Sequence, residues 1–116
     1  MNPAPHGLYR QEDKGDSMIK GIVGCKVKQD VDLEPILLKL KSHAMQYHGF
    51  KGMENLVGEG NASVVAMVST WESIEDWISW AQSSITQEVL RQAKTLLVEE
   101  PRVTTYKMFA PAIRWV

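Results

Sequence analysis

The feature that most limits the possible folds is a strand-to-helix switch in the second half of the chain. The run Val64–Val68 is apolar and mostly β-branched, which favours a strand. Ser73 follows, with Asp76 three residues later, and this spacing suits a capping hydroxyl and a first-turn carboxylate at a helix N-terminus. We therefore expect a strand that ends near Trp71 and a helix that starts at Ser73.

The expected helix carries a concentrated set of indoles. Trp77 shares a narrow apolar stripe with Ile74 and Ala81, and Trp80 flanks that stripe. Each indole offers a large apolar surface and one N–H group that needs a partner when it is buried. The tryptophans either pack as core residues between helix and sheet or form the floor of a ligand cavity, and the pattern alone favours core packing.

Periodicity and turn residues assign the other elements. Alternating patterns predict four strands, at 19–28, 50–58, 63–71 and 102–109. A first helix is expected to start at Asp30 or Asp32 and to stop at Gly49, and Ser84 with Gln87 marks the start of a last helix. The order β-α-β-β-α(α)-β is typical of a ferredoxin-like α+β fold, with helices on one face of an antiparallel sheet.

The 116 residues fit one domain with no room for a second core. We expect this domain to span residues 18–109. Residues 1–17 mix proline, glycine and charged residues without a period, which predicts a flexible N-terminal tail, and 110–116 form a short C-terminal tail.

Composition excludes several classes of function. The net charge is −1 and the lysines and arginines are spread along the chain, so no nucleic-acid partner is expected. No apolar run is long enough to span a membrane, and no basic segment followed by an apolar run marks a signal peptide. A lone cysteine, Cys25, cannot form an internal disulfide and is expected to be an inert core thiol. We expect a soluble cytoplasmic protein.

The expected third strand raises the question of what covers the far side of the sheet. Val64–Val68 is apolar on both of its faces, whereas a half-solvated sheet should alternate. A second copy of the chain, packed sheet against sheet about a twofold axis, would cover that face. The sequence therefore predicts a homodimer through the sheet face.

Several short segments give the chain a resemblance to a known family. These are Thr70–Ser73 at a strand end, Glu75–Trp77 in the following helix, Gly49-Phe50 after the first helix, and Glu100-Pro101 before the strand of Tyr106. Over residues 18–109 the chain resembles the antibiotic biosynthesis monooxygenase (ABM) domain. The resemblance implies a dimeric α/β barrel, with a pocket between the helices and the inner face of each sheet.

The resemblance also implies an activity that uses no cofactor, neither metal nor flavin. An electron-rich phenolate or carbanion can itself reduce dioxygen, so the protein has only to deprotonate it, keep it dry and stabilise the anion. In relatives that oxidise polyketides, aromatic residues at the positions of Trp71 and Trp77 lie by the pocket. Both are expected to bind substrate here.

A haem-degrading branch of the family gives a further comparison. Trp80 matches its tryptophan, but the position of its haem-ligating histidine is Leu90 here, and no histidine follows His48. Haem degradation by that route is therefore not expected.

The histidines of the first helix are the remaining titratable candidates. His43 and His48 are five residues apart, which does not place two imidazoles on one helix face, so no metal site is expected. His48 beside Gly49 suits a cation at a helix C-terminus. His43 is the better candidate for a catalytic general base.

These observations lead to two functional hypotheses. The first is a cofactor-independent monooxygenase of a small aromatic or quinol-like substrate, with His43 as catalytic base and with Trp71, Trp77 and Trp80 binding the substrate. The alternative is a non-catalytic module of the same fold that binds a small hydrophobic molecule or haem. Oxygenation needs a titratable group inside the pocket, and simple binding does not.

Overall fold

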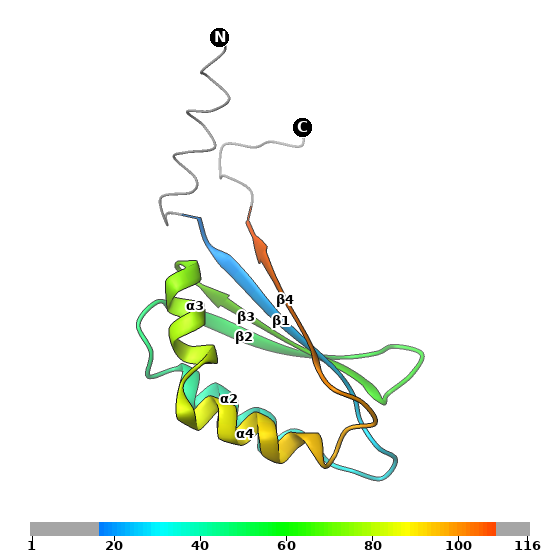
Figure 1. Cartoon of the computed structure of the whole chain (residues 1–116). Coiled ribbons are helices and arrows are strands. Elements are labelled where there is room, and N and C mark those ends of the chain that lie inside the picture. Colours follow the sequence, from blue (N-terminus) through cyan, green and yellow to red (C-terminus); the bar gives the residue numbers. More distant parts are fainter. Residues whose placement is uncertain (1–16, 109–116) are drawn as a thin grey trace, which may run out of the picture.

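Strand β1 (Ile19–Lys26) lies inside the sheet and pairs antiparallel with β3 (Val64–Trp71) and β4 (Arg102–Lys107). The computed structural model describes residues 17–108, and in it β2 (Phe50–Val57) completes the order β2-β3-β1-β4. The ferredoxin-like α+β fold is thus confirmed, and the sheet of the single chain is open (Figure 1). The predicted tails, apart from Ser17, lie outside the described residues.

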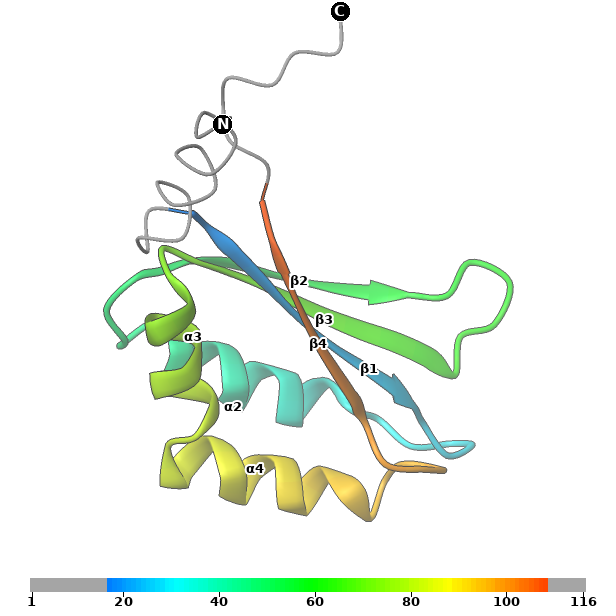
Figure 2. The ribbon, with the colours of Figure 1, turned by 45° about the horizontal axis from the view of Figure 1, so that its top comes forward.

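The three helices of residues 17–108 lie on one face of this sheet (Figure 2). Helices α2 (Glu34–Ala44) and α4 (Ser84–Lys94) lie side by side, and α3 (Ile74–Ala81) stands at the end of the sheet where β3 stops. Within the described residues no helix is long and apolar enough to cross a membrane.

Helices α3 and α4 start from local serine caps, whereas α2 starts at Glu34, two residues after the predicted Asp32, and Leu33 at its cap position makes no side-chain hydrogen bond. The Ser73 hydroxyl accepts the N–H of Asp76 at 3.2 Å, so the predicted cap of α3 is confirmed. Helix α4 starts at Ser84, as predicted, but Ser84 and Gln87 do not form the cap: the extended Ser83 is the cap, and its hydroxyl accepts the N–H of Thr86. Two adjacent serines offer the same chemistry, and the sequence does not distinguish them.

The first helix ends earlier than expected. Helix α2 stops at Ala44, and tighter turns follow in which Gln46 N–H bonds to the carbonyl of His43 and Tyr47 N–H to that of Ala44. The prediction that Gly49 stops the helix is therefore wrong. Gly49 does have a positive φ of 84°, but it serves the later turn into β2, where a β-carbon would collide with the Asp76 carboxylate.

The faces of the sheet follow from the strand register. On β3, Val65, Met67, Ser69 and Trp71 are buried beneath the helices, whereas Val64, Ala66 and Val68 lie on the opposite, outer face. The outer face also carries Ile22 and the half-exposed Leu56. The third strand is thus apolar on both faces, as expected.

Candidate functional site

The three tryptophans predicted to bind substrate lie together in the core. Trp71 at the end of β3 stacks on Trp80 of α3, with ring centroids 5.4 Å apart, and Trp77 packs against both. All three are at most 6% exposed. Trp77 also lies directly on the backbone of Gly21, where a β-carbon would collide with its ring. The structure brings these residues together as a packed cluster, and their contact with a ligand stays a prediction.

The indole N–H groups of this cluster differ in their partners. Trp71 Nε1 donates to the hydroxyl of buried Ser69 at 2.9 Å, and that hydroxyl donates to the carbonyl of Gly21 at 3.3 Å. Trp80 Nε1 is buried without a hydrogen-bond partner among the described residues. The indole of Trp71 is therefore anchored to the sheet by a hydrogen bond, whereas that of Trp80 contributes apolar surface only.

His43, the predicted base, lies in the last turn of α2, and its side chain faces the start of α4. Its Nε2 is 3.1 Å from the hydroxyl of Ser83, which also donates to the carbonyl of Trp80. Its ring meets Tyr47 edge-on. His43 lines a shallow groove on the surface of these helices with Ile85 and Val89. The structure thus places His43 at a helix junction, and its catalytic role stays a prediction.

A small apolar cavity lies between the sheet and the helices. It measures about 20 Å³, room for little more than one water molecule, and its lining includes Cys25, Leu40, Met67 and Leu90. Burial raises the pKa of the Cys25 thiol, so the reactive thiolate is disfavoured. This matches the expectation of an inert core thiol.

A much larger hollow opens beside it, between α2 and the edge strand β2, and we call it the α2–β2 cleft. Its volume is about 350 Å³, within the range of small-molecule sites. Asn55 and Val57 lie on the inner face of β2 and are both exposed, so the helices leave this part of the edge strand uncovered. The lining residues are Val27, Val31, Asp32, Leu33, Glu34, Leu37, Leu38, Asn55, Val57, Ala62 and Val65.

The walls of the α2–β2 cleft are apolar. Leu33 and Val65 are buried and belong, with Val27, to a hydrophobic cluster at its base. Leu33, Leu37 and Val65 also line the small cavity, so the two spaces adjoin between sheet and helices. A ligand with an apolar body could therefore enter from the edge of β2 and reach the core.

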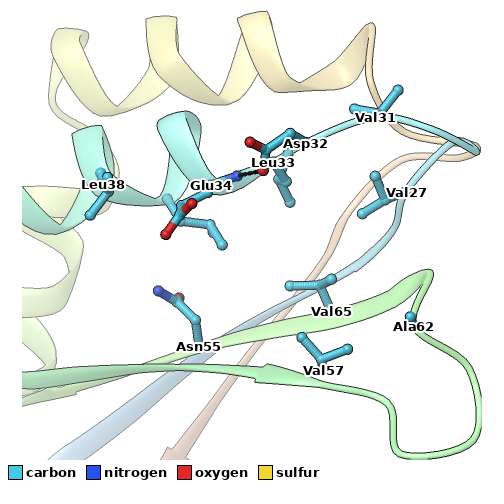
Figure 3. A pocket seen from close by; sticks show the side chains of 11 residues that line it. Val27, Val31, Asp32, Leu33, Glu34, Leu38, Asn55, Val57, Ala62 and Val65 are labelled. Atoms are coloured by element: carbon cyan, nitrogen blue, oxygen red, sulfur yellow. Dashed lines mark hydrogen bonds between the residues drawn. The ribbon is translucent and has the colours of Figure 1, made fainter.

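Three polar side chains stand around this apolar floor (Figure 3). Asp32 accepts the backbone N–H of Glu34 at 3.0 Å. Asn55 pairs in register with Met67, so it lies on the inner face of the sheet. Figure 3 shows the Glu34 carboxylate and the Asn55 amide facing each other across the opening. The cleft thus offers an apolar interior with an acidic and an amide group at its mouth.

A second polar cluster joins the turn before β2 to the start of α3. His48 Nδ1 lies 3.0 Å from Asp76 Oδ1, and this hydrogen bond, supported by the negative charges of Asp76 and Glu72, raises the pKa of His48. One ligand atom from each of His48, Glu72 and Asp76 lies within 4.8 Å of the others, the spacing of a potential metal site. Glu72, however, pairs with Lys51 at 2.9 Å, and Asp76 accepts the Ser73 hydroxyl. The charged groups of this cluster are therefore already paired within the protein. We interpret His48, Glu72 and Asp76 as a surface clamp, a set of contacts that holds the turn before β2 against the start of α3.

Sequence reasoning missed the α2–β2 cleft. Its residues come from three strand or loop segments and the first turns of α2, and no spacing motif connects them. One signal was present: Asn55, an amide on the inner face of a strand beside apolar neighbours, is unusual in a plain core.

Comparison with known proteins bears on the fold. No protein-family model and no curated protein matches the chain. Solved structures do match it. One from Bordetella bronchiseptica, named a "putative antibiotic biosynthesis monooxygenase", is 20% identical with a TM-score of 0.69, covering 81% of this chain and 99% of its own. This chain has the ABM fold.

Two further structures carry the same name. The one from Caulobacter crescentus is 11% identical with a TM-score of 0.73, and covers 87% of this chain and 99% of its own. The one from Nitrosomonas europaea is 14% identical with a TM-score of 0.67, and covers 84% and 95%. At these identities the likeness establishes the ABM fold and leaves the activity to the site itself.

Proposed function

We propose that this protein is a cofactor-independent monooxygenase that oxidises a small aromatic or quinol-like molecule in the α2–β2 cleft. The observation that carries the proposal is the cleft: an apolar hollow of about 350 Å³ that reaches the core and has ionisable groups at its mouth. The names of the structures that share the ABM fold support the same class of reaction.

The chemistry suits a site with few polar groups. In an anthrone-like substrate, loss of one proton gives a delocalised anion that transfers electrons to dioxygen. Two C–H bonds of the ring methylene are broken and a carbonyl forms there with one oxygen atom, while the other oxygen atom leaves as water. Substrate and dioxygen balance without an outside reductant, so the chain needs only to bind, deprotonate and exclude water.

A homodimer through the outer face of the sheet completes the proposal. Ile22, Ala66 and Val68 form the centre of that face, with half-exposed Leu56 and Tyr106 beside them. Glu54 lies opposite Val68 and Lys20 opposite Tyr106 on the same face, so the apolar residues form a patch bordered by two charges. An apolar patch with a polar border favours a partner surface. The strand residues that line the α2–β2 cleft, Asn55, Val57 and Val65, lie on the inner face of the sheet, so a partner on the outer face leaves the cleft accessible.

Oxygen uptake with anthrone tests the activity. We expect the purified protein, treated with a chelator, to consume one dioxygen per anthrone and to form anthraquinone faster than the uncatalysed reaction. Hydrogen peroxide instead of water as the product, or no acceleration with anthrone and hydroxylated derivatives, would contradict the proposal.

The binding module remains a second candidate, favoured by one observation. The ionisable side chains that line the cleft, Asp32 and Glu34, are both exposed, so neither is held in a dry interior. A binding module would show saturable anaerobic binding of anthrone, with no oxygen uptake when air is admitted. Neither histidine of α2 and its following turn lines the cleft, which gives a bound haem no axial imidazole there.

A further inference from the structure

The ionisable groups of the α2–β2 cleft are all acidic. Its lining includes Asp32 and Glu34 and contains no lysine, arginine or histidine. The segments facing α2 across the opening contribute Val27, Asn55, Val57, Ala62 and Val65, none of which is charged. A ligand in this space therefore meets negative charge at the mouth and apolar surface within.

The two carboxylates differ in what they already bind. The Asp32 carboxylate accepts the backbone N–H of Glu34 and so holds the start of α2, which has no cap from Leu33. The Glu34 side chain makes no hydrogen bond or ion pair with the residues that the structure describes, and it faces Asn55 (Figure 3). Glu34 is therefore the acid whose acceptor oxygens are available to a ligand.

Building on the proposed monooxygenase function, we propose that Glu34 is the general base and that the substrate is a neutral aromatic molecule with a phenol or enol hydroxyl. The aromatic body lies on Leu33, Leu37 and Val65, and the hydroxyl lies between Glu34 and Asn55. A Glu34 oxygen takes the hydroxyl proton, which in anthrone is that of the enol tautomer formed when one methylene hydrogen moves to the carbonyl oxygen. The O–H bond breaks, and its electron pair stays on the substrate oxygen and spreads into the rings.

The later steps close the balance of protons and electrons. Dioxygen accepts the electrons of the anion and bonds to a ring carbon as a peroxide. As the C–H bond of that carbon and the O–O bond break, a carbonyl forms there, and the released oxygen atom leaves as water with this proton and the one held on Glu34. The Asn55 amide donates a hydrogen bond to the substrate oxygen as its negative charge develops, which stabilises the anion where a carboxylate could not.

The charges that line the cleft also predict a preference between neutral and negatively charged substrates. A carboxylated substrate would bring a third negative charge beside Asp32 and Glu34, with no cation lining the cleft to offset it. Neutral hydroxylated aromatics should therefore bind better than their carboxylated analogues.

Glu34→Gln tests the base, with Glu75→Gln as a matched control. Glu75 is also a first-turn acid, but on α3, and it does not line the cleft. We expect Glu34→Gln to lower kcat for anthrone about 100-fold or more, the usual contribution of a general base. Its KM should stay within about threefold, since a base acts mainly in the transition state. The acid-side fall of the wild-type pH–rate profile should vanish in Glu34→Gln, and Glu75→Gln should match wild type.

Anaerobic binding provides a readout that is independent of turnover. Wild type should bind anthrone more tightly than an anthrone carboxylate, and Glu34→Gln should narrow that difference. Retained anthrone binding also shows that the variant is folded. Equal binding of the two ligands by wild type would overturn the assigned specificity.

The remaining outcomes separate the two proposals. A Glu34→Gln variant with wild-type kcat and pH profile overturns the role of Glu34 and leaves the monooxygenase intact. Loss of turnover in His43→Ala, with Glu34→Gln unaffected, gives the role of base to His43. A wild-type protein without turnover overturns the monooxygenase and the base together.

Discussion

Trp71 and Trp80 stack on each other in the core, yet only one of them is anchored by its N–H group. Trp71 donates to Ser69, and Trp80 Nε1 has no partner among the described residues. Replacing an unpaired buried N–H by a C–H removes a desolvation cost, whereas replacing a paired one leaves its acceptor without a donor. The two residues should therefore respond differently to the same substitution.

We predict that Trp71→Phe destabilises the protein more than Trp80→Phe, by about 1 kcal/mol in the free energy of unfolding. Both changes remove similar apolar surface, so each serves as the other's control. Denaturant unfolding of the two variants measures the difference. Equal losses, or a greater loss for Trp80→Phe, would contradict this account of the cluster.

His48 provides a pH-dependent contact at the surface. Its pKa is raised mainly by the hydrogen bond to Asp76, so its protonated form is favoured in the folded state. The resulting stabilisation is complete below the ordinary pKa of 6.5 and is lost as the pH rises through the raised folded value.

We predict that Asp76→Asn lowers the pKa of His48 toward its ordinary value, while Glu88→Gln, a change on α4 away from this clamp, leaves it unchanged. An NMR titration of the imidazole measures both. The account fails if the His48 titration is the same in wild type and Asp76→Asn.

Helix α3 sits directly on β1 because Gly21 of the strand has no side chain. The Trp77 ring occupies the space above Gly21 that a β-carbon would need, and the flanking buried residues Ile19 and Val23 frame it. Here glycine is required by the close approach of helix and strand.

Gly21→Ala should therefore cost about 1–3 kcal/mol, the usual range for overpacking a core. Gly52→Ala on β2 is the control, because a β-carbon there meets no atom within 4 Å. Thermal unfolding distinguishes them, and a stability of Gly21→Ala equal to that of Gly52→Ala would show that α3 can shift at no cost.

Element by element, local patterns predicted what local interactions decide. The Ser73 cap, the order of strands and helices along the chain and the two-faced apolar β3 follow from residues close in sequence or from period-two alternation. The end of α2 was not predicted correctly, because turns after Ala44 compete with the helix. The position of Gly49 is set by its contact with Asp76, a residue distant in the sequence. Long-range contacts of this kind leave little trace in a single sequence.

At the scale of the whole molecule, the outer sheet face is the surface that a second copy should cover. Val68 lies near its centre on β3, whereas Val65 and Met67 point the other way, into the core. Val68→Lys should place a charge in the dimer interface beside Glu54, its cross-strand neighbour on β2, and the cost of removing both charges from water should yield a monomer.

Ile85→Lys on α4 is the control for Val68→Lys, because Ile85 is equally apolar, 55% exposed and on the helix side. Light scattering should show a dimer for wild type and Ile85→Lys, and a monomer or aggregate for Val68→Lys. A monomeric wild type would defeat the dimer.

The site was harder to predict than the fold. Aromatic density drew attention to the tryptophans, but these pack on one another, and the α2–β2 cleft is lined by aliphatic residues with Asp32, Glu34 and Asn55. How much of the inner face of β2 the helices leave uncovered depends on how α2 lies across the sheet. No residue pattern along the chain encodes that placement.

The central claim is that the α2–β2 cleft, and not the tryptophan cluster, receives the ligand. It is tested most directly by NMR, by adding anthrone without oxygen and following backbone amide and indole signals. We predict that the largest shifts fall on Leu33, Asn55 and Val57, with the indole signals of Trp77 and Trp80 nearly unchanged. Shifts concentrated on those indoles, or on His43 and Ile85 in the groove between α2 and α4, would contradict the account.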